Sequence, residues 1–119
     1  MDAFDTITTV EDWQTACKKV SKTGCVLVLQ IGASWCKRCP PLHDHISKLK
    51  EDYKFEWVYS DASKTDLVEH FEIQQLPAVV IFQGSNRKQV WKKEAVAPNV
   101  VEEQIHLHCP IIFSTNADF

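Results

Sequence analysis

Two cysteines, Cys36 and Cys39, are separated by two residues and lie between two apolar segments of different periodicity. The segment before them, residues 25–31, is an almost wholly apolar and β-branched run, typical of a buried strand. The segment after them carries apolar residues at the i, i+4, i+7 spacing of one helix face: Leu42, Ile46 and Leu49. The sequence therefore predicts that the cysteine pair lies where a buried strand gives way to a helix over 36–51.

This position favours sulfur chemistry. Unpaired backbone N–H groups and the positive end of the helix dipole stabilise an anion at a helix N-terminus, and the thiolate is the reactive form of cysteine. We expect Cys36 at that terminus, partly exposed, and Cys39 almost one turn further on, close enough to close a small disulfide ring. Lys37 and Arg38 add two positive charges that favour thiolate over thiol. The pattern indicates a dithiol/disulfide couple in which Cys36 attacks and Cys39 resolves the mixed disulfide.

The composition limits the class of protein. The chain has 119 residues, 45% apolar and 24% charged, which suits one globular domain with its own core. A net charge of −3 argues against nucleic-acid binding through a basic surface. No apolar run reaches transmembrane length, and residues 1–5 lack the features of a signal peptide. An odd count of five cysteines favours a reducing compartment, so we expect a cytoplasmic protein without a membrane contact.

Strand and helix patterns alternate along the chain. A strand over 3–7 is followed by a helix that Thr8 or Thr9 caps, with Cys17 on its apolar face and Gly24 at its end. The later elements are expected in this order: strand 25–31, helix 36–51, strand 54–59, helix 64–71, a strand after Pro77 to 82, strand 88–92, and a helix that begins near Pro98 and has Val100, Val101, Gln104, Ile105 and His108 on its inner side. The order βαβαβαββα predicts an α/β domain, a mixed sheet with helices on both faces.

Two features resemble the thioredoxin family. Trp35-Cys36-x-x-Cys39 follows an apolar strand, as the family's active site does, and Pro77 opens a strongly apolar strand, as the family's cis-proline does. The resemblance covers about residues 4–108 and implies the thioredoxin fold in a single domain over 1–119. The extension, 109–119, is expected to pack back on the domain through Ile111, Ile112 and Phe113, or alternatively to bind a partner.

The resemblance also implies a function. Such a protein is a thiol–disulfide oxidoreductase that needs no cofactor and reduces disulfides in client proteins through a mixed disulfide on Cys36. An upstream dithiol or an NADPH-linked reductase would supply its electrons. The backbone of Leu76 is expected to pair with an extended client segment, Pro77 to pack against the cysteines and hinder metal binding, and Trp35 to shield the site. Lys37 and Arg38 are expected to attract acidic substrates or a glutathione-type carboxylate.

The sequence departs from the family in three places. The dipeptide between the cysteines is Lys37-Arg38 where thioredoxins have Gly-Pro, and two cations should make the disulfide more oxidising. Gln30 stands where the family has a buried aspartate that helps to deprotonate the resolving thiol, and Trp57 stands where the family has the partner lysine. Because glutamine cannot accept and release a proton near neutral pH, Cys39 would need water or its own acidity to ionise. We expect a specialised relative with a narrow set of partners.

Other interpretations stay open at the level of sequence. Zinc could bind a set formed by Cys36, Cys39, His43 and His45, although His45 projects away from the other three unless Pro40 and Pro41 break the helix. We interpret both histidines as surface residues. A second compact set is His106, His108 and Cys109, and an iron–sulfur cluster could bridge two chains through Cys36. The last alternative is a binding adaptor that holds a partner with Leu76, Pro77 and Trp35.

We expect a monomer, with Cys109 as the residue that could link two chains through a disulfide. Cys109 is placed at a helix end, where a thiol could be exposed.

Overall fold

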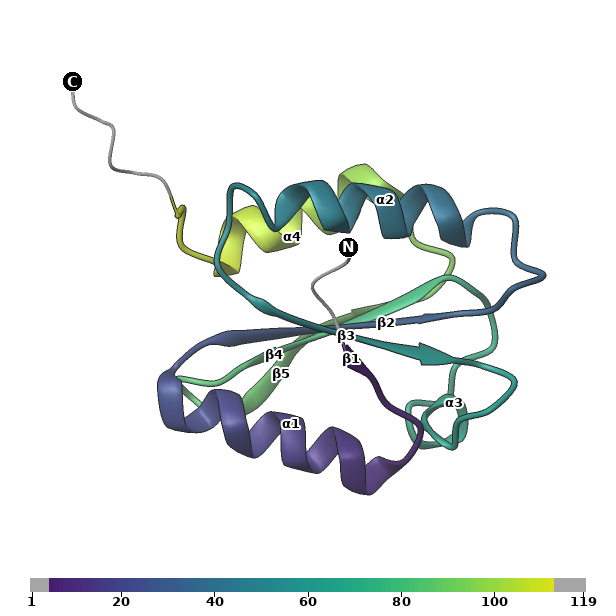
Figure 1. Ribbon diagram of the computed structural model, residues 1–119, viewed down its shortest axis with the longest axis horizontal. Helices are drawn as coiled ribbons and strands as arrows, with labels where there is room; N and C mark the ends of the chain where they lie inside the picture. Colours follow the sequence, from purple (N-terminus) through teal and green to yellow (C-terminus); the bar gives the residue numbers. More distant parts are fainter. Residues whose placement is uncertain (1–4, 113–119) are drawn as a thin grey trace.

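The computed structural model describes residues 5–112. A five-stranded sheet with the order β1-β3-β2-β4-β5 forms its centre. The elements are β1 (Asp5–Thr6), α1 (Val10–Thr23), β2 (Val26–Gly32), α2 (Cys39–Leu49), β3 (Glu56–Asp61), α3 (Leu67–His70), β4 (Ala78–Gln83), β5 (Lys88–Lys93) and α4 (Pro98–His108). Helices α2 and α4 cover one face of the sheet, and α1 and α3 lie on the other (Figure 1). The predicted order and the α/β class with helices on both faces are confirmed.

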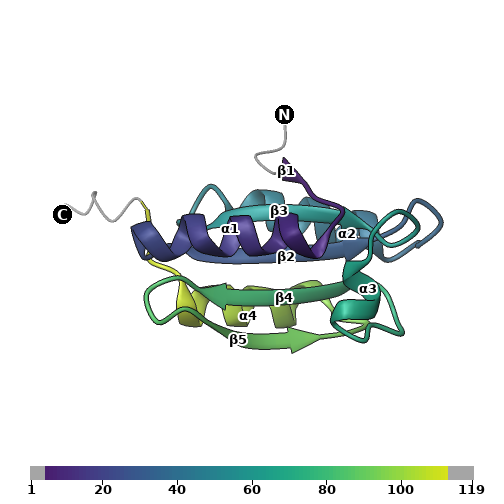
Figure 2. The ribbon, with the colours of Figure 1, turned by 90° about the horizontal axis from the view of Figure 1, so that it is seen from below.

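The sheet is mixed. β1, β3 and β2 run parallel, whereas β4 pairs antiparallel with β2 and β5 antiparallel with β4. The order of the strands is seen from below in Figure 2, with α1 in front of β2 and β3. Successive side chains of a strand point to opposite faces, so β2 supplies both cores. Val26 and Val28 pack on the side of α2 and α4, and Leu27, Leu29 and Ile31 pack on the side of α1 and α3.

Helix α1 has the ends that its sequence predicts. Thr9, rather than Thr8, is the N-cap: its hydroxyl accepts the backbone N–H of Asp12, and the Asp12 carboxylate accepts the backbone N–H of Thr9. Gly24 closes the helix with φ 77°, a left-handed conformation that glycine adopts without a Cβ penalty. Cys17 packs against the apolar core on this side, as predicted.

Helix α2 begins at Cys39, not at Cys36 as the sequence pattern suggested. The reason lies in Pro40 and Pro41, which have no N–H to donate. In a helix that starts at Cys36, both prolines would fall where intrahelical hydrogen bonds are required. With Arg38 as the N-cap, both fall in the first turn, where N–H groups have no intrahelical acceptor. The helix therefore starts as early as its prolines allow.

Several elements are shorter than their patterns suggest. β1 is a two-residue strand, and residues 3 and 4 of the predicted strand lie outside the described residues. α3 has four residues instead of the eight expected over 64–71. α4 starts at Pro98 as expected, and Val101 and Ile105 form its buried side, with Val100, Gln104 and His108 half-buried. None of the helices within residues 5–112 is long and apolar enough to cross a membrane.

The segment after α4 lies along the loop between α2 and β3. The backbone N–H of Lys54 donates to the carbonyl of Pro110, and that of Ile112 donates to the carbonyl of Asp52, each at 2.9 Å. The side chains of Ile111 and Ile112 are less covered than this backbone pairing would suggest, since each residue is 48% exposed. The segment therefore packs back on the domain through its backbone, whereas the side chains of Ile111 and Ile112 are only partly covered. Phe113 lies outside the described residues.

Candidate active site

Cys36 and Cys39 are joined by a disulfide in the turn between β2 and α2, with their Cα atoms 5.4 Å apart. Two tight turns bring them together. The N–H of Cys36 donates to the carbonyl of Ala33 at 3.1 Å, and the N–H of Cys39 donates to the carbonyl of Cys36 at 3.3 Å. The bond closes a small ring at the end of a buried strand, as the spacing of the two cysteines predicted.

Both cysteines are more enclosed than expected. Cys36 keeps 8% of its surface and Cys39 keeps 4%, so the expectation of a partly exposed Cys36 is wrong. Ala33 belongs to the same buried cluster, and Leu76 and Ala62 pack against it. The charged neighbours Lys37 and Arg38 are exposed, and Trp35 is 69% exposed. An approaching client would therefore meet these three side chains before it reaches the sulfurs.

The loop that leads into β4 carries the second predicted feature. The Leu76–Pro77 peptide bond is cis, and Pro77 is buried. Within residues 5–112 the backbone of Leu76 makes no hydrogen bond to another residue. Its N–H and carbonyl are therefore available for an extended segment of another chain.

Glu94 holds this loop in place. The backbone N–H of Gln74 donates to its carboxylate at 2.6 Å, and that of Gln75 donates at 3.0 Å. These two bonds lower the pKa of Glu94 below its ordinary value. The N–H of Val96 donates to the carbonyl of Pro77 at 3.1 Å, which fixes the other end of the loop.

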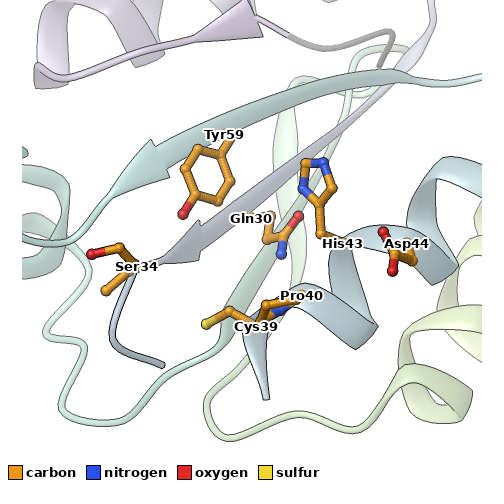
Figure 3. Close-up of a pocket in the computed structure, with 8 residues that line it drawn as sticks. Gln30, Ser34, Cys39, Pro40, His43, Asp44 and Tyr59 are labelled. Atoms are coloured by element: carbon orange, nitrogen blue, oxygen red, sulfur yellow. The ribbon is translucent and has the colours of Figure 1, made fainter. Parts of the chain in front are cut away.

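A cavity of about 300 Å³ lies behind the disulfide, between α2 and the sheet. Its lining combines one sulfur with polar side chains from three elements: Gln30, Ala33, Ser34, Cys39, Pro40, His43, Asp44 and Tyr59. Figure 3 shows Gln30 between the side chains of Tyr59 and His43, with Cys39 at the N-terminal end of α2 and the His43 ring extending from α2 toward the strands. Gln30 and Tyr59 are neighbours in the β2–β3 register, and both project toward α2.

Gly32 lets this arrangement form. A Cβ atom at Gly32 would lie 3.0 Å from the hydroxyl oxygen of Tyr59 and 3.1 Å from Sγ of Cys39. Both contacts are closer than a side chain accepts comfortably, so the absence of a side chain at Gly32 lets the tyrosine hydroxyl and the cysteine sulfur approach the same point. Cys39 thus has a polar neighbour that the sequence pattern did not indicate.

The sequence pattern offered His43 only as a possible zinc ligand or as a surface residue. It is half-buried and faces the sheet, with its ring centroid 4.8 Å from that of Trp57 and 6.0 Å from that of Tyr59. Its interpretation as a surface residue is therefore wrong. The signal was present, since His43 follows Cys39 by four residues and so lies on the same side of the helix. His45 points elsewhere and contacts Glu102 of α4, with Nε2 2.7 Å from the carboxylate.

The metal interpretations gain no support. Among residues 5–112, no group of three or more histidine, cysteine, aspartate or glutamate side chains is arranged to hold a metal ion. His43 and His45 diverge, and Cys36 and Cys39 are bonded to each other. His106 contacts the hydroxyl of Tyr53 at 2.8 Å.

The remaining described cysteines, Cys17, Cys25 and Cys109, are free thiols. Cys109 is buried rather than exposed, which corrects the expectation on which a disulfide-linked dimer depended. Burial raises its pKa to about 12, with a smaller contribution from Cys25, and burial raises the pKa of Cys17 to about 11. Since the thiolate is the nucleophile, these thiols are poor reagents at neutral pH.

The family model named Thioredoxin matches residues 6–105. The chain belongs to the thioredoxin family. Among curated thioredoxins, an H-type protein of Fagopyrum esculentum is 26% identical over 106 residues, 87% of this chain and 89% of that protein. The chloroplastic thioredoxin M4 of Arabidopsis thaliana is 28% identical over 81 residues, 65% of this chain and 40% of that protein.

Solved thioredoxins share the fold at lower identity. The Nicotiana alata thioredoxin NaTrxh superposes with a TM-score of 0.75 at 18% identity, covering 92% of this chain and 95% of that one. Mitochondrial thioredoxin 3 from Saccharomyces cerevisiae, in its oxidised form, superposes with a TM-score of 0.74 at 22% identity, covering 87% of this chain and 93% of that one. Thioredoxin membership and a bonded cysteine pair make this thioredoxin a thiol–disulfide oxidoreductase, and neither the adaptor nor the metal alternative is favoured.

Proposed function

We propose that this thioredoxin reduces disulfides in client proteins, with Cys36 as the nucleophile and Cys39 as the resolving thiol. The Cys36 thiolate attacks a client disulfide, forms a mixed disulfide and releases one client thiolate. The Cys39 thiol loses its proton, and its sulfur attacks Sγ of Cys36. The Cys36–Cys39 bond forms, the bond to the client breaks, and the second client thiolate leaves with the electron pair. The client gains two electrons and the cysteine pair loses two.

The carrying observation is the placement of the two sulfurs. Cys39 is the less exposed cysteine, and its sulfur lies at the cavity between α2 and the sheet, beside Gly32 and Tyr59. Cys36 keeps more surface and directly follows the exposed Trp35. A client can therefore reach Cys36 first, whereas Cys39 is placed to attack from behind.

The surface around Cys36 suits an extended and acidic client segment. The free backbone of Leu76 offers a donor and an acceptor to such a segment, and Pro77 and Trp35 border the same site. Lys37 and Arg38 are exposed and add two positive charges, which would attract acidic side chains.

The cycle needs a source of electrons, which we propose is an upstream dithiol or an NADPH-linked reductase. Such a cycle belongs in a reducing compartment, and we propose the cytoplasm. Three free cysteines in the described part of the chain fit that setting. The burial of Cys109 favours a monomer.

The experiment compares three variants in the reduction of an insulin-type disulfide. Cys36→Ser should reduce the substrate no faster than the added dithiol alone, because no nucleophile remains. Cys39→Ser should form the mixed disulfide and fail to release it, so that mass spectrometry finds the client bound to Cys36. Cys17→Ser should retain full activity, since Cys17 packs on the opposite face of the sheet. Substantial activity in Cys36→Ser would overturn the proposal.

A further inference from the structure

The cavity behind Cys39 contains a side chain whose chemistry suits the resolving step. Cys39 and His43 are four residues apart on α2, so they project from the same side of the helix, and both line the cavity. The imidazole is half-buried between the helix and the rings of Trp57 and Tyr59, at centroid distances of 4.8 and 6.0 Å. It is therefore held between α2 and the sheet, at the wall of the cavity that Cys39 also lines.

Gln30 gives this cavity its polar interior. The residue is fully buried, and neither Nε2 nor Oε1 has a hydrogen-bond partner among the described residues. A buried amide that lacks protein partners favours ordered water. Water has room in this cavity of about 300 Å³, and Ser34, His43 and Tyr59 add polar side chains to its lining. The site is thus suited to a short water path between Cys39 and His43.

The reaction requires a proton acceptor here. The Cys39 thiol must lose its proton before it attacks, and an amide such as Gln30 cannot take it. Burial, with a smaller contribution from the charge of Asp61, raises the pKa of Tyr59, so this hydroxyl keeps its proton and acts as a donor. Imidazole is the side chain that ordinarily exchanges a proton between about pH 5 and pH 8.

We propose that His43 accepts the proton of Cys39, directly or through one water in the cavity, as the resolving thiol attacks the mixed disulfide on Cys36. This inference rests on the proposed function, since it assigns the acid–base partner of the same cycle. The proton moves from Sγ of Cys39 to the imidazole, the Cys39–Cys36 bond forms, and the client thiolate leaves. His43 then returns the proton to the departing thiolate or to solvent.

The other groups around His43 define the controls. The titratable side chains that share its cavity are Cys39 and Asp44 of α2 and Tyr59 of β3, and Gln30 faces it from β2. Asp44 is exposed, at the rim of the cavity. Asp44→Asn therefore tests the second group that could receive the proton, and His45→Gln removes the histidine that contacts Glu102 instead.

The experiment follows a single turnover. Reduced protein is mixed with a peptide disulfide and quenched in acid at successive times, and mass spectrometry measures the mixed disulfide and the oxidised protein. Wild-type decay of the mixed disulfide should accelerate as pH rises between about 5 and 8, because neutral imidazole accepts a proton and imidazolium does not. In His43→Gln the decay should be at least roughly a hundredfold slower at pH 7, and this inflection should be absent.

Two features separate this result from a loss of structure. Formation of the mixed disulfide by Cys36 should be unchanged in His43→Gln. Its decay should approach the wild-type rate toward strongly alkaline pH, where hydroxide can take the thiol proton in place of the imidazole. His45→Gln and Asp44→Asn should keep the wild-type pH profile.

The proposal fails if the mixed disulfide of His43→Gln decays at the wild-type rate and its pH profile keeps the same inflection. It also fails if Asp44→Asn removes that inflection. A slowing of His43→Gln by the same factor at every pH would also overturn it, since that result would indicate a packing role. If no mixed disulfide ever forms on Cys36 in the wild type, the proposed function fails instead, and the two outcomes are distinguishable.

Discussion

The two faces of the sheet are built from the same strands but differ in kind. On the side of α1 and α3, β2 contributes Leu27, Leu29 and Ile31 to an apolar cluster, and the buried Ser60 beside it donates its hydroxyl to the carbonyl of Ile7. On the side of α2, the same strand contributes Gln30 at the point where the apolar cluster stops and the cavity beside Cys39 begins. Apolar packing thus dominates the first face, whereas on the second face polar groups replace apolar ones at the active-site end. The difference indicates that stability and chemistry can be altered separately.

The largest expected effect lies on the apolar face. Leu29 is fully buried there, so Leu29→Ala should lower the free energy of unfolding by about 2–5 kcal/mol, through lost burial and the cavity left behind. Denaturant unfolding of the oxidised protein measures this loss. The pH profile of mixed-disulfide decay should not change, because Leu29 points away from Cys39. A shift of this pH profile in Leu29→Ala would show that the two faces do not act independently.

Gln30→Leu should leave stability intact and slow the reaction, the opposite of Leu29→Ala. It replaces a fully buried amide by an apolar side chain of similar size, so the free energy of unfolding should stay the same or rise by up to about 1 kcal/mol. The resolving step should slow, because the cavity loses the amide that would hold water near Cys39. Unfolding and single-turnover measurements on the same variant test both parts. A loss of stability as large as that of Leu29→Ala would show that Gln30 is simply part of the core.

On the apolar face, the buried strands and the ends of α1 are predicted well, whereas α3 has half the length that its pattern suggested. Buried strands and helix faces have their own periodicities, and Thr9 with Asp12 and Gly24 mark the ends of α1 by local hydrogen bonding and backbone conformation. The cis-proline at Pro77 was predicted by resemblance rather than by periodicity.

The active-site face was harder to predict, because it depends on tertiary register. Nothing local in the sequence places Tyr59 beside Gln30, since the β2–β3 pairing brings them together. Cys36 is enclosed by Leu76, which is remote in the chain. The start of α2 could have been predicted, since Pro40 and Pro41 fit only its first turn.

The loop that carries Leu76 and Pro77 belongs to neither face, and it gives the smallest effect. Glu94→Ala removes the carboxylate that accepts the N–H groups of Gln74 and Gln75. Because this contact is solvent-exposed, we expect KM for a client peptide to rise only roughly two- to fivefold at pH 7, with kcat little changed. Steady-state kinetics measure both parameters, and Glu103→Ala, an exposed change on α4, is the control.

The acid side of the pH profile sharpens this prediction. The pKa of Glu94 is lowered in the folded protein by the two backbone N–H donors, so its contribution to holding the loop is present above the unfolded-state pKa of a glutamate. That contribution is lost as pH falls through the lowered folded-state pKa, where the carboxylate gains a proton. The difference in KM between wild type and Glu94→Ala should therefore shrink toward acid pH. If the difference in KM grows on acidification, or if only kcat changes, Glu94 acts on the sulfur chemistry rather than on the position of the loop that carries Leu76 and Pro77.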